Sequence, residues 1–251
     1  MRNYYLTLLL ITLSISSIIL FSSLPNSGLT GLFVLVFIAS LAISIISFVL
    51  SIAKNFSRIS KLEKFTTEKK FSYQDRNDSK AFDLLTRFNV ELPEHKVKGS
   101  NIIEFTTGES SITALDLTYM KRFLKYKIGI NHSVICIKNP VLDVGSFKIA
   151  PKNNFLCPKF IDKTDDVIKP ETKSMFFDKF KVASVNHEKT LSILSHDFED
   201  FLLSNEMTII GSDDELLLIK LGDALSAEKI ANVPEQTKRL LAILSKTPVH
   251  A

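Results

Sequence analysis

The run of residues between Arg2 and Lys54, which contains no charged side chain, constrains the chain more than any other feature. About 20 apolar residues cross the hydrocarbon core of a bilayer, and this run is more than twice that length. It is divided at SSLPNSG, where Pro25, Asn26 and Gly28 favour a turn. The sequence therefore predicts a hairpin of two transmembrane helices, over residues 4–23 and 29–53.

The positions of the basic residues predict the orientation of this hairpin. Arg2 precedes the first span, Lys54 and Arg58 follow the second, and the connecting loop has no basic residue. Basic flanks stay on the cytoplasmic side, so we expect a multi-pass protein of the inner (cytoplasmic) membrane with both termini in the cytoplasm. An alternative is that Arg2 and the first apolar stretch form a cleaved signal peptide. The second span would then still keep the rest of the chain inside.

One face of the second predicted span carries small hydroxyl side chains and then positive charges, at alternating spacings of four and three residues. These residues are Ser40, Ser44, Ser47 and Ser51, followed by Lys54, Arg58 and Lys61. Small side chains let a second helix approach closely in lipid, so the serines predict a helix-packing face toward the first span or a second copy of the chain. The alternative is that their hydroxyls bond back to the preceding turn. The basic residues predict contact with the membrane surface.

The remaining chain shows the pattern of an α+β domain with mostly antiparallel strands and flanking helices. Gly108 separates two strand signals, residues 101–105 and 112–120, and further strands are predicted over residues 126–139 and 145–151 and in a hairpin over residues 207–221. Helices are predicted over residues 80–89, over residues 186–205 with Asn186 as the cap, and from Pro234 onward. Residues Tyr73 to Ser79 are predicted to be a linker. The expected organisation is a transmembrane hairpin (1–54), a juxtamembrane helix and linker (55–79) and a cytoplasmic domain (80–251).

Several short elements of this domain resemble a group of uncharacterised bacterial membrane proteins. They are FKIAP at residues 147–151, FFDKFKV at residues 176–182, the stretch LSILSHDFEDFLLSN and the hairpin TIIGSDDELLLIKL. The resemblance covers nearly the whole chain. It implies an amino-terminal two-helix transmembrane hairpin with a cytoplasmic α+β domain, and it implies no catalytic residues.

The sequence contains none of the patterns that bind cofactors or metals. The glycines of the cytoplasmic part are too widely spaced for a phosphate-binding loop. His132 and Cys136 would lie on one strand face but about 13 Å apart, and the acidic group beside His196 is typical of a solvated helix face. Cys136 has the surroundings of a small buried strand residue. We therefore predict no catalytic, cofactor-binding or metal-binding residues.

Positive charge is concentrated in the membrane-proximal half of the cytoplasmic part. The stretch KRFLKYK combines two aromatic residues with four basic ones: Lys121, Arg122, Lys125 and Lys127. This composition suits a lipid headgroup layer or a nucleic-acid backbone, and an anchored domain meets lipid first. The alternative is a solvated sheet edge. We predict that these four residues contact the membrane surface, with nucleic acid as the less favoured partner.

Taken together, these patterns predict a membrane-anchored binding or scaffold protein. Its α+β domain would face a protein partner or the inner membrane surface, with membrane lipid as one partner and a homo-oligomer through the transmembrane hairpin as another. The alternative function is a lipid-acting enzyme or transport accessory that uses Cys157 or His196 in a site without a sequence signature. Nothing in the sequence indicates an enzyme.

Overall fold

The computed structural model describes residues 30–90, 97–123, 126–152, 160–161, 165–169 and 174–245. The chain divides into two compact units, Met1–Lys61 and Leu62–Ala251. The predicted first span, residues 4–23, lies outside the described residues.

The long helix α2 covers Thr30–Glu68, a length of 39 residues. It contains the predicted second span together with the predicted helical extension, without a break at Ala53. The helix ends where Lys70 adopts a left-handed backbone with φ 58°. The first unit therefore passes into the second through helical residues.

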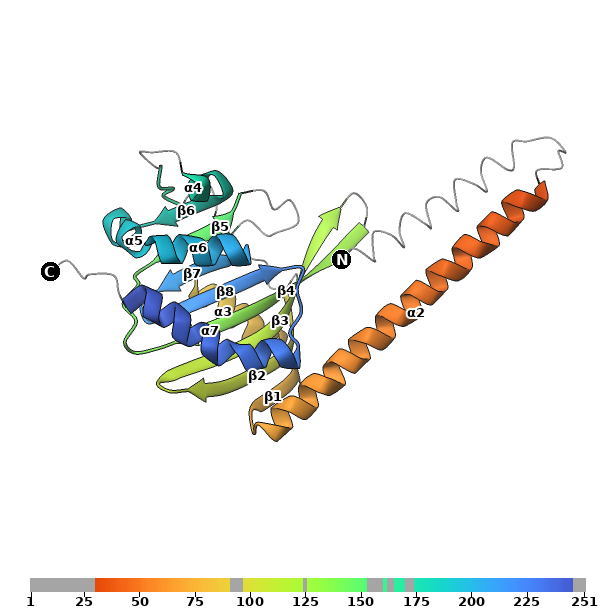
Figure 1. The fold of residues 1–251 in the computed structure, drawn as a ribbon, viewed down its shortest axis with the longest axis horizontal. Helices are drawn as coiled ribbons and strands as arrows, with labels where there is room; N and C mark the ends of the chain where they lie inside the picture. The colour runs from red at the N-terminus through yellow and green to blue at the C-terminus, as the bar shows by residue number, and fades with distance from the viewer. Residues whose placement is uncertain are drawn as a thin grey trace. The chain divides into compact units, whose positions relative to one another are not determined.

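The second unit contains one eight-stranded sheet, in which every pair of neighbouring strands is antiparallel. The strands are β1 (Ser72–Arg76), β2 (Val97–Thr107), β3 (Ser110–Phe123), β4 (Tyr126–Lys138), β5 (Phe147–Pro151), β6 (Phe180–Ser184), β7 (Thr208–Ser212) and β8 (Glu215–Leu221). Their order in the sheet is β1-β2-β3-β4-β8-β7-β5-β6 (Figure 1). The predicted α+β class with a large antiparallel sheet is confirmed.

The predicted hairpins are present, and their turns follow from local backbone preferences. Gly108 has φ +58° between β2 and β3, and Asp213 has φ 50° between β7 and β8. Glycine has no Cβ and aspartate has a short polar side chain, so both residue types tolerate the left-handed region better than bulky residues do.

Helices cover both faces of the sheet. On one face lie α6 (His196–Asn205) and α7 (Ala227–Ser245), and α3 (Asp78–Arg87) lies on the other (Figure 1). The central strand β8 contributes Leu216 and Leu218 to the first layer and Leu217 and Ile219 to the second. Because β8 is buried on both faces, its sequence is a continuous apolar run.

A third apolar cluster joins the end of α2 to the sheet and to α7. Leu62 is fully buried there, and Phe65 packs against the same cluster. The other buried members are Ile103, Phe105, Ile112, Ala114, Leu225, Ile230 and Val233. The last turns of α2 are therefore part of the domain core.

The predicted linker at Tyr73–Ser79 is wrong. Strand β1 occupies Ser72–Arg76 and pairs with β2, and α3 begins at Asp78 after the cap Asn77. Only Tyr73 of the strand is partly buried, so the segment lacks the alternation of apolar and polar residues that would have revealed it. The segment is a strand because it pairs with β2. The helix predicted at residues 80–89 is confirmed as α3.

The single helix predicted over residues 186–205 is also wrong. Asn186 caps α5 (His187–Ile193), but a second helix, α6, starts after Ser195, whose hydroxyl accepts from the Phe198 N–H. The spacing of the apolar residues continues across the break between the two helices. The periodicity of the sequence therefore does not reveal the break, which is marked by the Ser195 cap. A short helix that was not predicted, α4 (Met175–Lys179), precedes β6.

The last helix starts seven residues before the predicted position. Proline is favoured in the first turn of a helix, which is why the sequence predicted a start near Pro234. In the structure α7 begins at Ala227, with the Ser226 hydroxyl accepting from the Lys229 N–H, and Pro234 lies inside the helix.

Candidate functional site

Helix α2 exposes a broad apolar surface. By length and composition it is the one described helix that is suited to crossing a membrane, with a mean hydropathy of 1.8 over its most apolar window. Its exposed apolar side chains are Ile38, Leu41, Ile43, Ile45, Ile46, Phe48, Val49, Leu50, Ile52 and Phe56. A surface of this size and composition is typical of contact with lipid or with other helices.

The serine face is the least exposed part of this helix. Ser44 is buried, with 6% of its surface exposed, and Ser40, Ser47 and Ser51 are partly buried. Every other residue between 38 and 53 is exposed. The Ser44 hydroxyl donates to the Ser40 carbonyl at 2.8 Å, as expected for a hydroxyl that bonds back to the preceding turn. The local hydrogen bond is therefore present at Ser44, and the packing role of the serine face stays a prediction.

The basic residues predicted to follow the serines differ in exposure. Lys54 and Lys61 are exposed. Arg58 is partly buried, and its Nη2 donates to the Asn55 Oδ1 at 3.0 Å. The two lysines are available at the surface, whereas the guanidinium of Arg58 is held along the helix.

The KRFLKYK stretch lies at the far end of the β3–β4 hairpin. Strand β2 pairs with β3 only as far as Tyr119, and β8 pairs with β4 only as far as His132. Beyond these positions the ladder of β3 and β4 continues to the pair Phe123 and Tyr126 (Figure 1). Arg122 pairs with Lys127 and Lys121 with Ile128. Lys125 lies outside the described residues.

This register assigns the positions of the ribbon to two faces. Directly paired residues of an antiparallel ladder share a face, and neighbours along a strand alternate between faces. Arg122 and Lys127 therefore occupy positions on one face. The pair Phe123 and Tyr126 occupies the other, together with Lys121 and Ile128.

The residues considered for chemistry are not brought together. His196 lies exposed at the start of α6, with its Nε2 3.6 Å from the Asp200 carboxylate, and Cys157 lies outside the described residues. Cys136 is buried in β4 as predicted, and burial raises the pKa of its thiol to about 12. A thiol with this pKa is not a nucleophile at neutral pH. The described residues contain no group of three His, Cys, Asp or Glu side chains placed to hold a metal ion.

Two buried polar sites were missed by the sequence reasoning. Asp116 is buried and accepts hydrogen bonds from the Asn101 side chain at 2.8 Å and the Leu225 N–H at 2.7 Å. Glu215, whose side chain is 11% exposed, pairs with Arg87 of α3 and Lys138 of β4. Asp116 and Glu215 connect elements far apart in the sequence, so no local spacing identifies them.

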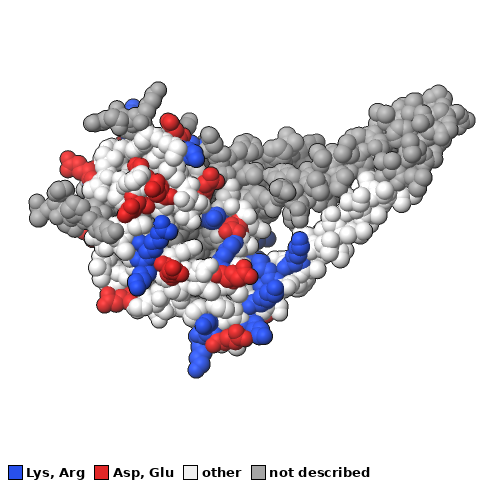
Figure 2. All heavy atoms as spheres, in the orientation of Figure 1, with Lys and Arg blue, Asp and Glu red and all other residues white. Residues whose placement is uncertain are grey.

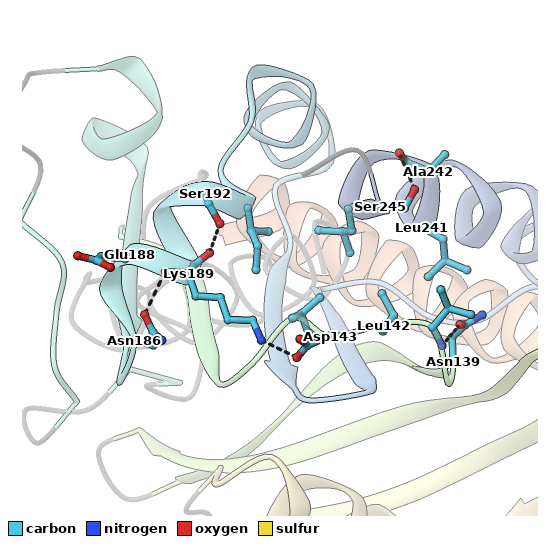
Figure 3. Close-up of a pocket in the computed structure, with 14 residues that line it drawn as sticks. Asn139, Leu142, Asp143, Asn186, Glu188, Lys189, Ser192, Leu241, Ala242 and Ser245 are labelled. Atoms are coloured by element: carbon cyan, nitrogen blue, oxygen red, sulfur yellow. Dashed lines mark hydrogen bonds and ion pairs between the residues drawn. The ribbon is translucent and has the colours of Figure 1, made fainter. Parts of the chain in front are cut away.

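A cavity of about 580 Å³ lies between the loop after β4, helix α5 and the last turns of α7 (Figure 3). Lys189 of α5 forms an ion pair with Asp143 of the loop, and the two side chains meet at the edge of the cavity (Figure 3). Apolar side chains dominate the remaining wall: Val141, Leu142, Val144, Ile193, Leu241 and Leu244. The volume is within the range of small-molecule sites.

Charges of both signs are interspersed on the face of the domain that carries α6 and α7 (Figure 2). Basic residues outnumber acidic ones in residues 54–159, and acidic residues outnumber basic ones in residues 160–251.

No protein-family model and no curated protein matches the chain. A similar solved structure is the crystal structure of the mycobacterial trehalose monomycolate transport factor A, TtfA, at 11% sequence identity and a TM-score of 0.47. The similarity covers 74% of this chain and 94% of that chain.

Proposed function

We propose that the chain is a binding or scaffold protein anchored in a bacterial inner membrane by a two-helix hairpin, residues 4–23 and 29–53, with both termini in the cytoplasm. The α+β domain engages a protein partner or the membrane surface. The observation that supports this proposal is α2, which exposes apolar side chains from Ile38 to Phe56 and supplies buried residues to the domain from Leu62 onward.

The basic residues have a specific role in this proposal. Lys54 and Lys61 lie past the apolar stretch of α2, where they meet anionic headgroups, and the basic positions of the β3–β4 ribbon do the same. Each lysine or arginine near an anionic leaflet contributes about 1 kcal/mol, and this contribution is weakened by salt. Several such contacts hold the domain at the surface without a stereospecific site.

The anchor is tested by placing charge in the apolar surface of α2. We expect the double variant Leu41→Arg, Ile45→Arg to leave the membrane fraction in alkaline carbonate, because an arginine near the middle of a span costs about 2.5–3.5 kcal/mol on insertion scales. Both side chains are exposed and lie off the serine face. The measurement is the share of full-length protein in the membrane pellet.

The matched control adds the same two charges where the helix is already polar. Ser57 and Ser60 are exposed on α2 beyond the apolar stretch. The Ser57→Arg, Ser60→Arg variant should stay in the pellet like the wild type. If the Leu41→Arg, Ile45→Arg variant also stays there, α2 is not required for anchoring, and the other proposed span, residues 4–23, is left as the anchor.

The packing role of the serine face is tested with bulky substitutions. We expect Ser44→Leu combined with Ser47→Leu to weaken self-association or partner capture by about tenfold or more, because a leucine holds a neighbouring helix away from the backbone. The measurement is native mass spectrometry of the full-length protein in mild detergent. It also reveals the mass of any second polypeptide at fixed stoichiometry.

A control for this experiment adds the same side chains elsewhere on the helix. Ala42 and Ala53 are exposed, so Ala42→Leu combined with Ala53→Leu should leave the stoichiometry as it is. Unchanged association in the serine variant would remove the serine face from the proposal. A monomer in the wild type that retains phospholipid would favour the membrane surface over a protein partner.

A further inference from the structure

The cavity beside α5 has a wall that is already fixed in place by hydrogen bonds. Asn139 begins the loop after β4, and its side chain donates to the Ser110 hydroxyl at 2.8 Å and accepts from the Val141 N–H at 2.8 Å. The backbone N–H groups of Asn139 and Val144 donate to carbonyls of the turn between β7 and β8, at 2.9 and 3.1 Å. Because this wall is held at both ends, a ligand does not have to order it. The entropic cost of binding is therefore lower.

The interior of the cavity carries no uncompensated charge. Three charged residues line it, and two of them, Asp143 and Lys189, neutralise each other. The third, Glu188, is exposed and points away from the hollow (Figure 3). A charged ligand group entering this space would lose hydration without gaining an opposite charge.

We infer that this cavity binds the hydrocarbon chain of a single-chain amphiphile whose uncharged polar head stays at the mouth. The observation that supports this inference is the apolar lining of the cavity, whose volume is about 580 Å³. This lining is formed by Leu142, Val144, Ile193, Leu241 and Leu244. Burial of a chain there is favourable because it removes the methylene groups of the chain from water. The inference goes beyond the proposed anchoring and does not depend on it.

The experiment uses a monoacylglycerol with a photoreactive diazirine in its chain. The full-length protein is held in an amphipathic polymer, so that no free detergent competes for the cavity. After irradiation, the labelled peptides are identified by mass spectrometry. We expect labelling of the loop after β4 and of the end of α7, and we expect unlabelled monoacylglycerol to compete it away.

Two alanines of α7 provide a matched pair of variants. Ala242 lines the cavity and is exposed, and Ala231 is exposed on the same helix and does not line this cavity. Ala242→Phe fills the space and should reduce labelling of the cavity by about tenfold or more. Ala231→Phe should leave it unchanged. Equal unfolding midpoints show that both variants remain folded.

A second pair of variants tests whether the site requires an apolar lining, without changing the buried core of the domain. Val141 lines the cavity and is 73% exposed, whereas Val185 is 88% exposed and does not line it. Val141→Arg should weaken labelling of the cavity, and Val185→Arg should not.

Three outcomes would overturn the inference. One is labelling confined to α2, which leaves the anchoring proposal intact. Another is labelling of the cavity that is as strong in Ala242→Phe as in the wild type. The third is loss of a bound polypeptide in the Ala242→Phe variant without loss of labelling, because the cavity then holds a protein segment.

Discussion

Replacing Gly211 with alanine is expected to destabilise the domain by about 1–3 kcal/mol, the range for adding a methyl group to a packed core. An ideal Cβ at Gly211 would lie 2.3 Å from Cε1 of Phe147. Phe147 is 1% exposed and belongs to the core layer under α6 and α7, so its ring cannot move aside into solvent. The measurement is the free energy of unfolding of the full-length protein in denaturant, followed by circular dichroism.

The direct contact between these two residues gives the prediction a specific control. Phe147→Leu alone should also destabilise the domain, because it leaves a cavity. In the double variant the smaller side chain makes room for the alanine, so the combined loss should fall short of the sum by about 1 kcal/mol. Strict additivity of the two losses would show that the methyl group and the ring do not compete for the same space.

Acid is expected to destabilise the domain through His132. This side chain is 0% exposed in β4, and neither ring nitrogen has a hydrogen-bond partner among the described residues. Its neighbours in the ladder are Leu117 and Leu221, and the Phe160 ring meets it edge-on at 6.4 Å. Burial without a partner lowers the pKa of His132 from 6.5 to about 4.

The direction of the pH effect follows from these two values. The unfolded chain takes up the proton near pH 6.5 and the folded chain only near pH 4, so protons stabilise the unfolded state. The contribution to stability is fully present above pH 6.5 and is lost as the pH falls toward 4. At 1.36 kcal/mol per pKa unit, the total loss is about 3 kcal/mol.

The His132→Leu variant isolates this contribution from the carboxylates that also titrate in acid. The difference between the unfolding free energies of wild type and variant should change by about 3 kcal/mol between pH 7.5 and 4. The His196→Leu variant is a comparison, because it removes an exposed imidazole and not a buried one. A wild type and a His132→Leu variant with the same acid dependence would contradict the prediction.

The strands were largely predictable because most of them carry their own pattern. The residues of β8 form an apolar run, and the turns before β3 and β8 contain Gly108 and Asp213, which suit a positive φ. The exception is β1, whose partner β2 lies more than twenty residues further along the chain. A polar edge strand forms because the neighbouring strand offers free backbone N–H and C=O groups. The sequence of the edge strand itself does not show that such a neighbour exists.

The helix errors have a common cause. Apolar spacing and proline preference are local signals, but α5 ends and α6 begins under a cap, Ser195, that the spacing does not reveal. Pro234 lies in the interior of α7, where packing of Ile230 and Val233 against the third apolar cluster outweighs the local preference. Tertiary packing outweighed the proline preference in α7, whereas the break between α5 and α6 coincides with the Ser195 cap.

The candidate sites were predictable only where they depend on composition. The serine face of α2 was visible from spacing, and its packing role stays a prediction. The cavity was not visible, because the loop after β4, α5 and α7 come together only through the strand order β4-β8-β7-β5-β6. The sequence also did not reveal that the ring nitrogens of His132 lack a hydrogen-bond partner among the described residues, because His132 looks like an ordinary strand residue there.

The third apolar cluster has a consequence for the order in which the chain can fold during synthesis. It joins Leu62, at the start of the domain, to Leu225, Ile230 and Val233 near the end. Strand β4 likewise finds its second partner only when β8 has been made. After α2 has left the ribosome, most of the domain must therefore still be synthesised before the residues of this cluster can pack together. Folding that waits for such distant contacts is slow, and until then the end of α2 presents an uncovered apolar surface to chaperones.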